Sequence, residues 1–229
     1  MDSLIVPFEV VNVPFSNFQA NLQTYLQTNL QAKQLDIKSF SASATIFCCD
    51  PCDTSNLYVL LCQRAYRDDA LGKDNSWGGT WETPGGSREL GEELPDTAFR
   101  ETEEETGLHV SHVSSHVYLT LFNHKNVPMA RCTFHTDVHE ELRPQRRWCD
   151  EQQRAIGPKD SGIKLIPGEH MDFCWATEAQ IRNSLPYNAA NTQSGLVILE
   201  NKRDVILAIF GRLRRSQIDM VKLPVNNRR

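Results

Sequence analysis

The sequence predicts an α/β fold in which strands and helices alternate within one main domain. β-rich runs and amphipathic segments follow one another through the middle and the end of the chain. The composition is that of a globular protein, because 40% of the 229 residues are hydrophobic and 23% are charged. This length suffices for one well-buried domain with extensions and is short for two.

Residues 1–40 are predicted to form an N-terminal arm and a helix outside the main domain. A short apolar arm broken by two prolines comes first, and Ser16 can cap a helix over 17–34. We expect the apolar stripe of this helix to pack on the domain. A dimer helix would use the same stripe, so a homodimer stays open. The stripe recurs every four residues, at Phe18, Leu22, Leu26 and Leu30.

The main domain is predicted over 41–215, followed by a loose tail over 216–229. Strands are expected over 42–49, 57–63, 113–122, 128–138 and 171–176. Helices are expected over 95–106, 177–184 and 195–215. Between these elements, 139–168 is a polar insertion of a length that is uncommon without a function. We expect substrate selectivity to depend on it and on the loop over 65–80.

An acidic helix stands at the centre of the sequence. A glycine loop leads into a helix that should begin near Pro95 and end at Gly107. Glu101, Glu104 and Glu105 have helical spacing and share one face, where like charges repel. A solvated acidic surface would explain such a face, and so would a divalent cation, since magnesium is held by carboxylate oxygens.

The pattern around this helix is G-x5-E-x7-R-E-U-x-E-E-x-G-U, in which U is a bulky apolar residue. It is formed by Gly86, Glu92, Arg100, Glu101, Glu104, Glu105, Gly107 and Leu108. It resembles the Nudix box, here Gly86–Leu108, and Trp81–Gly86 is similar to the W-E-x-P-G-G segment that precedes the box. Thr102 departs from the pattern at a position that is usually aliphatic. We expect it to face the core and donate to the carbonyl four residues earlier.

The resemblance implies an α/β/α sandwich with a mixed β-sheet, to which the N-terminal helical arm and a C-terminal helix are added. It also implies a pyrophosphohydrolase that depends on Mg²⁺ or Mn²⁺ and acts on acid anhydrides in phosphorus-containing compounds. Attack by a metal-activated water would cleave the phosphoanhydride of a nucleoside-diphosphate-linked or other diphosphate small molecule. The sequence does not select one substrate within this class.

The same resemblance implies a metal-binding set on the acidic face. Glu104 and Glu105 are expected as ligands, and Glu101 as ligand or general base. Gly86 would complete this set through its backbone, because Gly85 and Gly86 allow the chain to turn and approach the metal.

The remaining site residues follow from the resemblance as well. Arg100 is expected to hold the carboxylates by ion pairing, with Glu92 as an auxiliary group. Glu169 is the candidate for a further ligand or base from the loop before the last strand. Arg64 and Trp81 are the candidate substrate contacts. Other carboxylates compete with Glu169, namely Glu140, Glu141 and Glu151.

Two alternatives keep the same fold, a catalytically silent ligand-binding module and a diphosphate isomerase, and the complete box argues against both. A net charge of −5 disfavours a nucleic-acid polymer as partner. No apolar run approaches membrane-spanning length. Seven cysteines without a regular framework, and no secretory signal, favour reduced thiols in the cytoplasm, with the nucleus as the other option.

Overall fold

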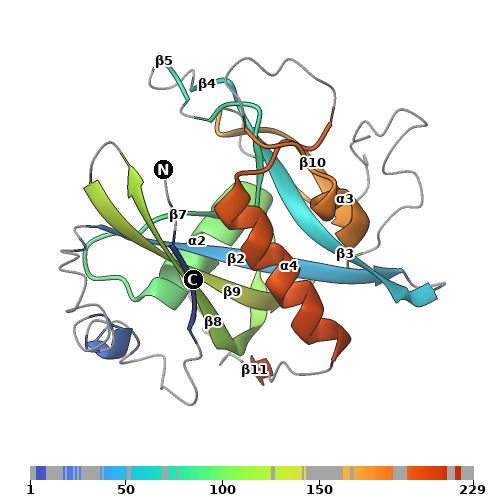
Figure 1. The fold of residues 1–229 in the computed structure, drawn as a ribbon, viewed down its shortest axis with the longest axis horizontal. Coiled ribbons are helices and arrows are strands. Elements are labelled where there is room, and N and C mark those ends of the chain that lie inside the picture. The colour runs from blue at the N-terminus through green and yellow to red at the C-terminus, as the bar shows by residue number, and fades with distance from the viewer. Residues whose placement is uncertain are drawn as a thin grey trace.

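A mixed nine-stranded sheet forms the centre of the computed structural model, and helices cover its two faces (Figure 1). The strands are β1 (Leu4–Phe8), β2 (Ser39–Asp50), β3 (Asp53–Arg64), β4 (Arg67–Asp68), β5 (Lys73–Asp74), β6 (Trp81–Glu82), β7 (Gly85–Ser87), β8 (Val110–His124), β9 (Val127–Val138), β10 (His170–Thr177) and β11 (Met220–Lys222). The helices are α2 (Leu94–Thr106), α3 (Glu178–Arg182) and α4 (Glu200–Arg214). The structure describes residues 4–8, 18, 20–22, 24, 26, 37, 39–50, 53–68, 72–75, 77–124, 127–140, 142, 162–165, 168–187, 195–215 and 220–222.

The strand order is β1-β8-β9-β2-β3-β10, while β11 joins β8, β6 joins β3 and β7 joins β2. The β2–β9 pair is parallel and the other pairs are antiparallel, so the sheet is mixed, as predicted. β4 and β5 form a separate two-stranded sheet within the polar loop that follows β3. None of the helices in these described ranges is long and apolar enough to cross a membrane.

Side-chain alternation along β2 places apolar groups on both faces of the sheet. Ala42 is buried in one cluster with Leu94 and Ala98 of α2. Phe47 faces the opposite side, where its ring centroid lies 4.8 Å from that of Phe210 in α4. Period-two alternation therefore lets α2 and α4 cover opposite faces, and Figure 1 shows α2 behind the strands and α4 in front. The expected α/β/α sandwich is confirmed.

The same alternation in β9 decides which side chains can form a site. Ala130, Cys132 and Phe134 are buried on the α2 face. Arg131 and Thr133 lie on the other face and line a pocket beside α4. The division follows from the alternation of side chains along the sequence of this strand.

The N-terminal segment contributes to the main sheet and its core. β1 pairs with β8, with Leu4 opposite Leu121. Among the described helical residues within 18–26, Phe18 and Leu22 are buried, and the ring centroid of Phe18 lies 5.4 Å from that of Phe134. Leu30, the last member of the apolar stripe, lies outside the described residues.

Two differences from the prediction come from pairing between distant segments. The last helix begins at Glu200 instead of 195, because Val197 forms a β-bridge with Leu185 and its carbonyl accepts from the Trp81 amide. The tail expected to be loose provides β11, which pairs with β8. Most of the insertion over 139–168 lies outside the described residues.

Candidate active site

The loop and helix that carry the acidic motif are fixed by local signals. α2 has Pro95 in its first turn and ends at Gly107, whose φ of 69° lies in the left-handed region that favours glycine. The Gly107 amide closes the helix by donating to the Glu103 carbonyl at 2.8 Å. Thr102 faces the core and donates to the Ala98 carbonyl at 2.7 Å, as expected from its place in the sequence.

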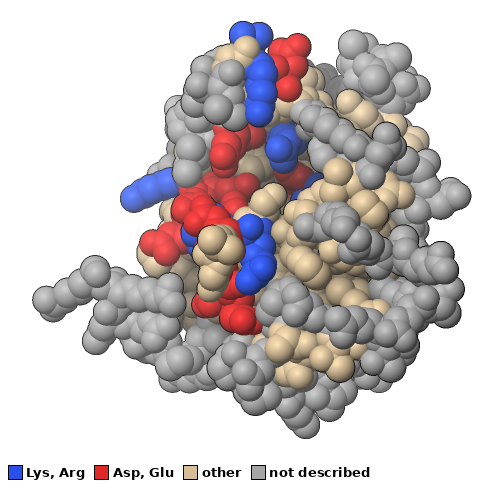
Figure 2. Space-filling view, turned by 90° about the vertical axis from the view of Figure 1, so that its left-hand side faces the viewer, with Lys and Arg blue, Asp and Glu red and all other residues tan. Residues whose placement is uncertain are grey.

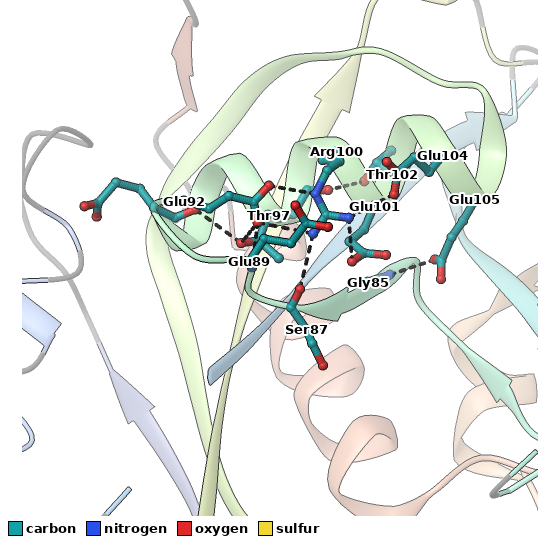
Figure 3. A network of polar contacts seen from close by, with 12 residues as sticks. Gly85, Ser87, Glu89, Glu92, Thr97, Arg100, Glu101, Thr102, Glu104 and Glu105 are labelled. Atoms are coloured by element: carbon teal, nitrogen blue, oxygen red, sulfur yellow. Dashed lines mark hydrogen bonds and ion pairs between the residues drawn. The ribbon is translucent and has the colours of Figure 1, made fainter. Parts of the chain in front are cut away.

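Arg100 joins the loop before α2 to the carboxylates on the helix (Figure 3). Its Nε lies 2.7 Å from Glu92 Oε1, and its Nη1 lies 2.9 Å from both Glu101 Oε1 and Glu104 Oε2. Its Nη2 also donates to the Ser87 carbonyl at 3.2 Å. Hydrogen bonding by Arg100 lowers the pKa of Glu92 to about 2, so Glu92 is a fixed anion at neutral pH.

Glu101 lies directly over the backbone of the glycine loop. A Cβ atom added to Gly86 would stand 2.4 Å from Glu101 Oε1, so a side chain at this position would displace the carboxylate. Partial burial raises the pKa of Glu101, although Arg100 acts in the opposite direction. Glu101 is thus held between the arginine and the loop backbone.

Glu105 points away from Arg100, towards Gly85 (Figure 3). Its Oε2 accepts a hydrogen bond from the Gly85 amide at 2.8 Å, and the residue is only 5% exposed. Burial, followed by the charge of Glu82, raises the pKa of the Glu105 carboxyl well above its usual range. The three carboxylates on the α2 face therefore differ, because Glu104 is exposed and paired with arginine whereas Glu105 is buried.

His170 lies between two buried carboxylates. Its side chain is 1% exposed, with Nδ1 3.8 Å from Glu105 Oε1 and Nε2 3.6 Å from Glu82 Oε1. Neither ring nitrogen has a hydrogen-bond partner within the described part of the chain. Glu105, Glu169 and His170 each offer a ligand atom, and these atoms lie within 4.8 Å of one another.

Glu82 connects this group to two cations. It is buried on β6 and contacts Lys202 Nζ through Oε2, and Arg64 Nη1 lies 2.6 Å from its Oε1. Burial alone would raise the pKa of Glu82, but Lys202, His170 and Arg64 together hold it well below its usual range. Glu82 is therefore ionised although it is buried.

The two expected substrate contacts are both engaged within the protein. Arg64 pairs with Glu82 and is partly exposed. Trp81 is 4% exposed and packs in an apolar cluster with Val59 and Ile206. Its ring has no free face for a ligand, so the expectation for Trp81 is corrected by its place in the core.

A pocket of about 640 Å³ adjoins this group of charges. Lys202 links the two, because it lines the pocket and contacts Glu82. Arg131 also lines the pocket; its Nε donates to Ser41 Oγ at 3.1 Å and its guanidinium lies 5.9 Å from the centroid of the Phe122 ring. Trp77, Phe122 and Tyr187 are the aromatic residues that line the pocket.

On the surface, Figure 2 shows Asp and Glu side chains gathered on one face with Lys and Arg side chains among them.

The family profile described as NUDIX domain matches residues 40–197 of the sequence. This chain belongs to the Nudix family. It is accordingly a hydrolase of acid anhydrides in phosphorus-containing compounds. A search of curated proteins gave no match.

Solved Nudix structures resemble the chain at low sequence identity. A Caenorhabditis elegans Ap4A hydrolase in a binary complex is 16% identical, with 78% of this chain and 98% of that chain covered and a TM-score of 0.44. A NUDIX hydrolase from Listeria monocytogenes is 14% identical, with 79% and 97% covered and a TM-score of 0.48. One from Nitrosomonas europaea is 14% identical, with 80% and 76% covered and a TM-score of 0.48.

Four site residues of this Nudix protein were not singled out in the sequence. Glu82, Arg131, His170 and Lys202 come from β6, β9, β10 and α4, so only the fold brings them together. Arg131 had a signal, since alternation in its strand placed it opposite the apolar face. His170 directly follows Glu169, and its burial depends on the pairing of β10 with β3, which no local pattern in the sequence indicates.

Proposed function

We propose that this Nudix protein is a divalent-metal-dependent pyrophosphohydrolase of a diphosphate-containing small molecule. The observation that carries the proposal is the group of ligand atoms from Glu105, Glu169 and His170 within 4.8 Å of one another. The residues fit a cation, because burial and the charge of Glu82 disfavour an ionised Glu105 unless a positive charge compensates it. A bound Mg²⁺ or Mn²⁺ would offset the charge of the diphosphate and increase the acidity of water.

The carboxylates of the Nudix box would have different roles around this cation. Glu105 would hold it, with Glu104 beside it, and the missing side chain at Gly86 leaves room for Glu101 as ligand or general base. Arg100 would position Glu101 and Glu104 through its 2.9 Å contacts. This arrangement keeps the repelling carboxylates oriented before substrate enters.

Two carboxylates are candidates for the general base. Glu101 stands over the glycine loop, and Glu169 is exposed next to the buried Glu105. A base must reach the proton of the attacking water while it remains accessible to substrate. Glu169 supplies a ligand atom to the proposed cation group, so Glu101 is the candidate left for the base, and the hydrogen bond that it accepts from Arg100 holds it in place.

The adjoining pocket would hold the group attached to the diphosphate. Its volume of about 640 Å³ falls within the usual range for small-molecule sites. Trp77, Phe122 and Tyr187 offer aromatic surface, and Arg131 offers a guanidinium that suits a phosphate oxygen. We therefore expect a nucleoside or another ring-bearing group beside the cleaved phosphates.

Phosphate-product release tests this function across nucleoside triphosphates, nucleotide sugars, ADP-ribose, dinucleoside polyphosphates and isoprenoid diphosphates, with and without Mg²⁺ or Mn²⁺. Glu105→Gln should lower kcat at least about a hundredfold, because a metal ion contributes several kcal/mol to the stabilisation of transition-state charge. Glu103→Gln is the matched control, since Glu103 is exposed on the same helix and pairs with His109.

Retained turnover in Glu105→Gln would refute the role of that ligand. Metal binding without turnover on any compound would favour the silent binding module, and a rearranged diphosphate product would favour the isomerase.

A further inference from the structure

The group of ligand atoms around Glu105 includes a nitrogen atom from a buried histidine, His170. We propose that Nδ1 of His170 binds the same divalent cation as Glu105 and Glu169, and that this nitrogen makes the site prefer first-row transition ions such as Mn²⁺ over Mg²⁺. The inference rests on the proposed function, since it concerns the cation of that site.

The separation of His170 from Glu105 suits a shared ion better than a hydrogen bond. Nδ1 lies 3.8 Å from Glu105 Oε1, which exceeds the range of about 2.7–3.2 Å for such a bond. Two ligand atoms that each stand about 2.0–2.2 Å from one ion are about 3–4 Å apart. The pair therefore has the spacing of two ligands that face a common centre.

The burial of the ring requires a partner for its nitrogens. The side chain is 1% exposed, and the described residues supply no hydrogen bond to Nδ1 or Nε2. A buried polar atom without a partner costs about 1–3 kcal/mol, so native structures rarely keep one without an ion or a water beside it. A cation at Nδ1 supplies that partner.

The backbone holds the histidine in this position. A β-bulge lies between His170 and Asp172 where β10 pairs with β3, and bulges beside active sites redirect side chains. On the N-terminal side of His170, the Glu169 carbonyl accepts a hydrogen bond from the Ala65 amide at 2.8 Å. The position of the ring is thus set by strand pairing and not by a free loop.

The second nitrogen of the ring faces a carboxylate that can fix its tautomer. Nε2 lies 3.6 Å from Glu82 Oε1, and Glu82 is itself held by Arg64 and Lys202. Metal-binding histidines usually direct their other N–H at a carboxylate, which leaves the first nitrogen as the donor atom. Lys202–Glu82–His170 is such a supporting chain behind the proposed ligand.

A nitrogen ligand changes which ion the site prefers. Magnesium takes oxygen ligands almost exclusively, whereas imidazole binds first-row transition ions well. A site of two carboxylates and one imidazole should therefore bind Mn²⁺ more tightly than Mg²⁺. Replacement of the imidazole should reduce that difference.

Pulsed electron paramagnetic resonance of Mn²⁺ bound to the intact protein tests the ligand directly. Protein labelled with ¹⁵N-histidine should show modulation from a directly bound nitrogen of that isotope. His170→Gln should lose this modulation and bind Mn²⁺ about 10–100-fold more weakly, with Mg²⁺ affinity changed much less. His109→Gln is the control, because His109 is exposed and pairs with Glu103 and Glu140.

The spectrum of the wild-type protein can overturn the proposal even where the variant does not fold. Absence of histidine-nitrogen modulation there, or its persistence in His170→Gln, overturns the proposal. Hydrolysis with Mg²⁺ is followed in parallel. Turnover by a wild-type protein without this modulation would reject the nitrogen ligand and leave the proposed hydrolysis standing.

Discussion

The Nε atom of Arg100 lies 2.7 Å from Oε1 of Glu92, and this contact ties α2 to the loop that precedes it. The other end of the same guanidinium holds Glu101 and Glu104. One planar side chain thus determines the position of both the loop and two carboxylates of the candidate site. A point charge such as lysine cannot reproduce this set of contacts.

Arg100→Lys should keep the charge and lose this geometry. We expect a loss of about 1–3 kcal/mol in the free energy of unfolding, since hydrogen bonds between charged, partly buried groups break. Urea denaturation at neutral pH measures it. Arg67→Lys is the control, because Arg67 is exposed and pairs with Asp74 at 3.4 Å. Equal effects of the two substitutions would contradict the structural role of Arg100.

The low pKa of Glu92 predicts a dependence of stability on pH. The carboxyl titrates near pH 4.3 in an unfolded chain and at about 2 in the folded protein. Its contribution is therefore fully present above about pH 4.3 and is lost as the pH falls towards 2. Unfolding curves measured between pH 6 and pH 2.5 should fall more steeply for the wild type than for Glu92→Gln. Parallel curves would show that Glu92 does not titrate in this way.

Gly86→Ala should damage activity more than stability. The atoms nearest to the added Cβ are those at the end of the Glu101 side chain, 2.4 Å away, and that flexible group can move aside. We expect the thermal midpoint to change little and kcat to fall about a hundredfold, as happens when a catalytic group is misplaced by about 1 Å.

Gly85→Ala, at the neighbouring residue, should instead damage stability. Its Cβ would stand 2.3 Å from the Ala42 carbonyl oxygen, so the pairing of β7 with β2 would have to open. We expect a large loss of thermal stability here. The same thermal midpoint for both variants would contradict the packing around this loop.

His109 should titrate above the usual range for histidine. A hydrogen bond with Glu140 raises its pKa, and Glu103 contributes as well. A raised folded-state pKa means that the contact stabilises the protein below about pH 6.5, and that the stabilisation is lost as the pH rises through the folded-state pKa. Nuclear magnetic resonance titration of the ring measures the shift, which Glu140→Gln should reduce. An unchanged titration in that variant would assign the shift to another group.

Leu22→Ala tests whether the N-terminal helical residues pack on the domain. Leu22 is buried with Phe18 and Leu26, so its truncation should cost about 2–5 kcal/mol of unfolding free energy. The exposed Asn21→Ala is the control and should stay within about 0.5 kcal/mol. A loss that depended on protein concentration would instead assign this stripe to a dimer contact.

The acidic helix could be predicted almost to the residue because its signals are local. Pro95 and Gly107 mark its ends in the sequence, and α2 runs from Leu94 to Thr106. The cores of the long strands followed from hydrophobic alternation. Their full extents did not, because β8 and β9 continue as far as their partners allow, and no local pattern encodes that limit.

Elements that depend on distant partners could not be predicted in the same way. The apolar residues Leu196 and Leu199 fit a helical pattern, but pairing between Leu185 and Val197 keeps this segment extended. Trp81 was placed correctly next to the glycine loop, and its burial in the core could not be seen from the motif.

In the candidate site, too, some features follow from local spacing in the sequence and others depend on distant segments. Spacing predicted that Glu101, Glu104 and Glu105 share a helix face, and they do. That Glu105 turns into the protein towards His170 depends on β10, which follows it by more than sixty positions. The ionic contacts of a buried residue therefore depend on how strands that are distant in the sequence pair in the sheet.

The outer edge of β8 is occupied by two segments from opposite ends of the chain. β1 pairs with positions 117–121 of that strand and β11 with positions 112–114. An exposed strand edge is a template for pairing between molecules, so these two short strands act as shields against self-association. A protein trimmed to residues 39–215 would retain the whole family match and α4 with Lys202, and would expose the bare edge of β8. We expect that fragment to aggregate even if its active site is intact.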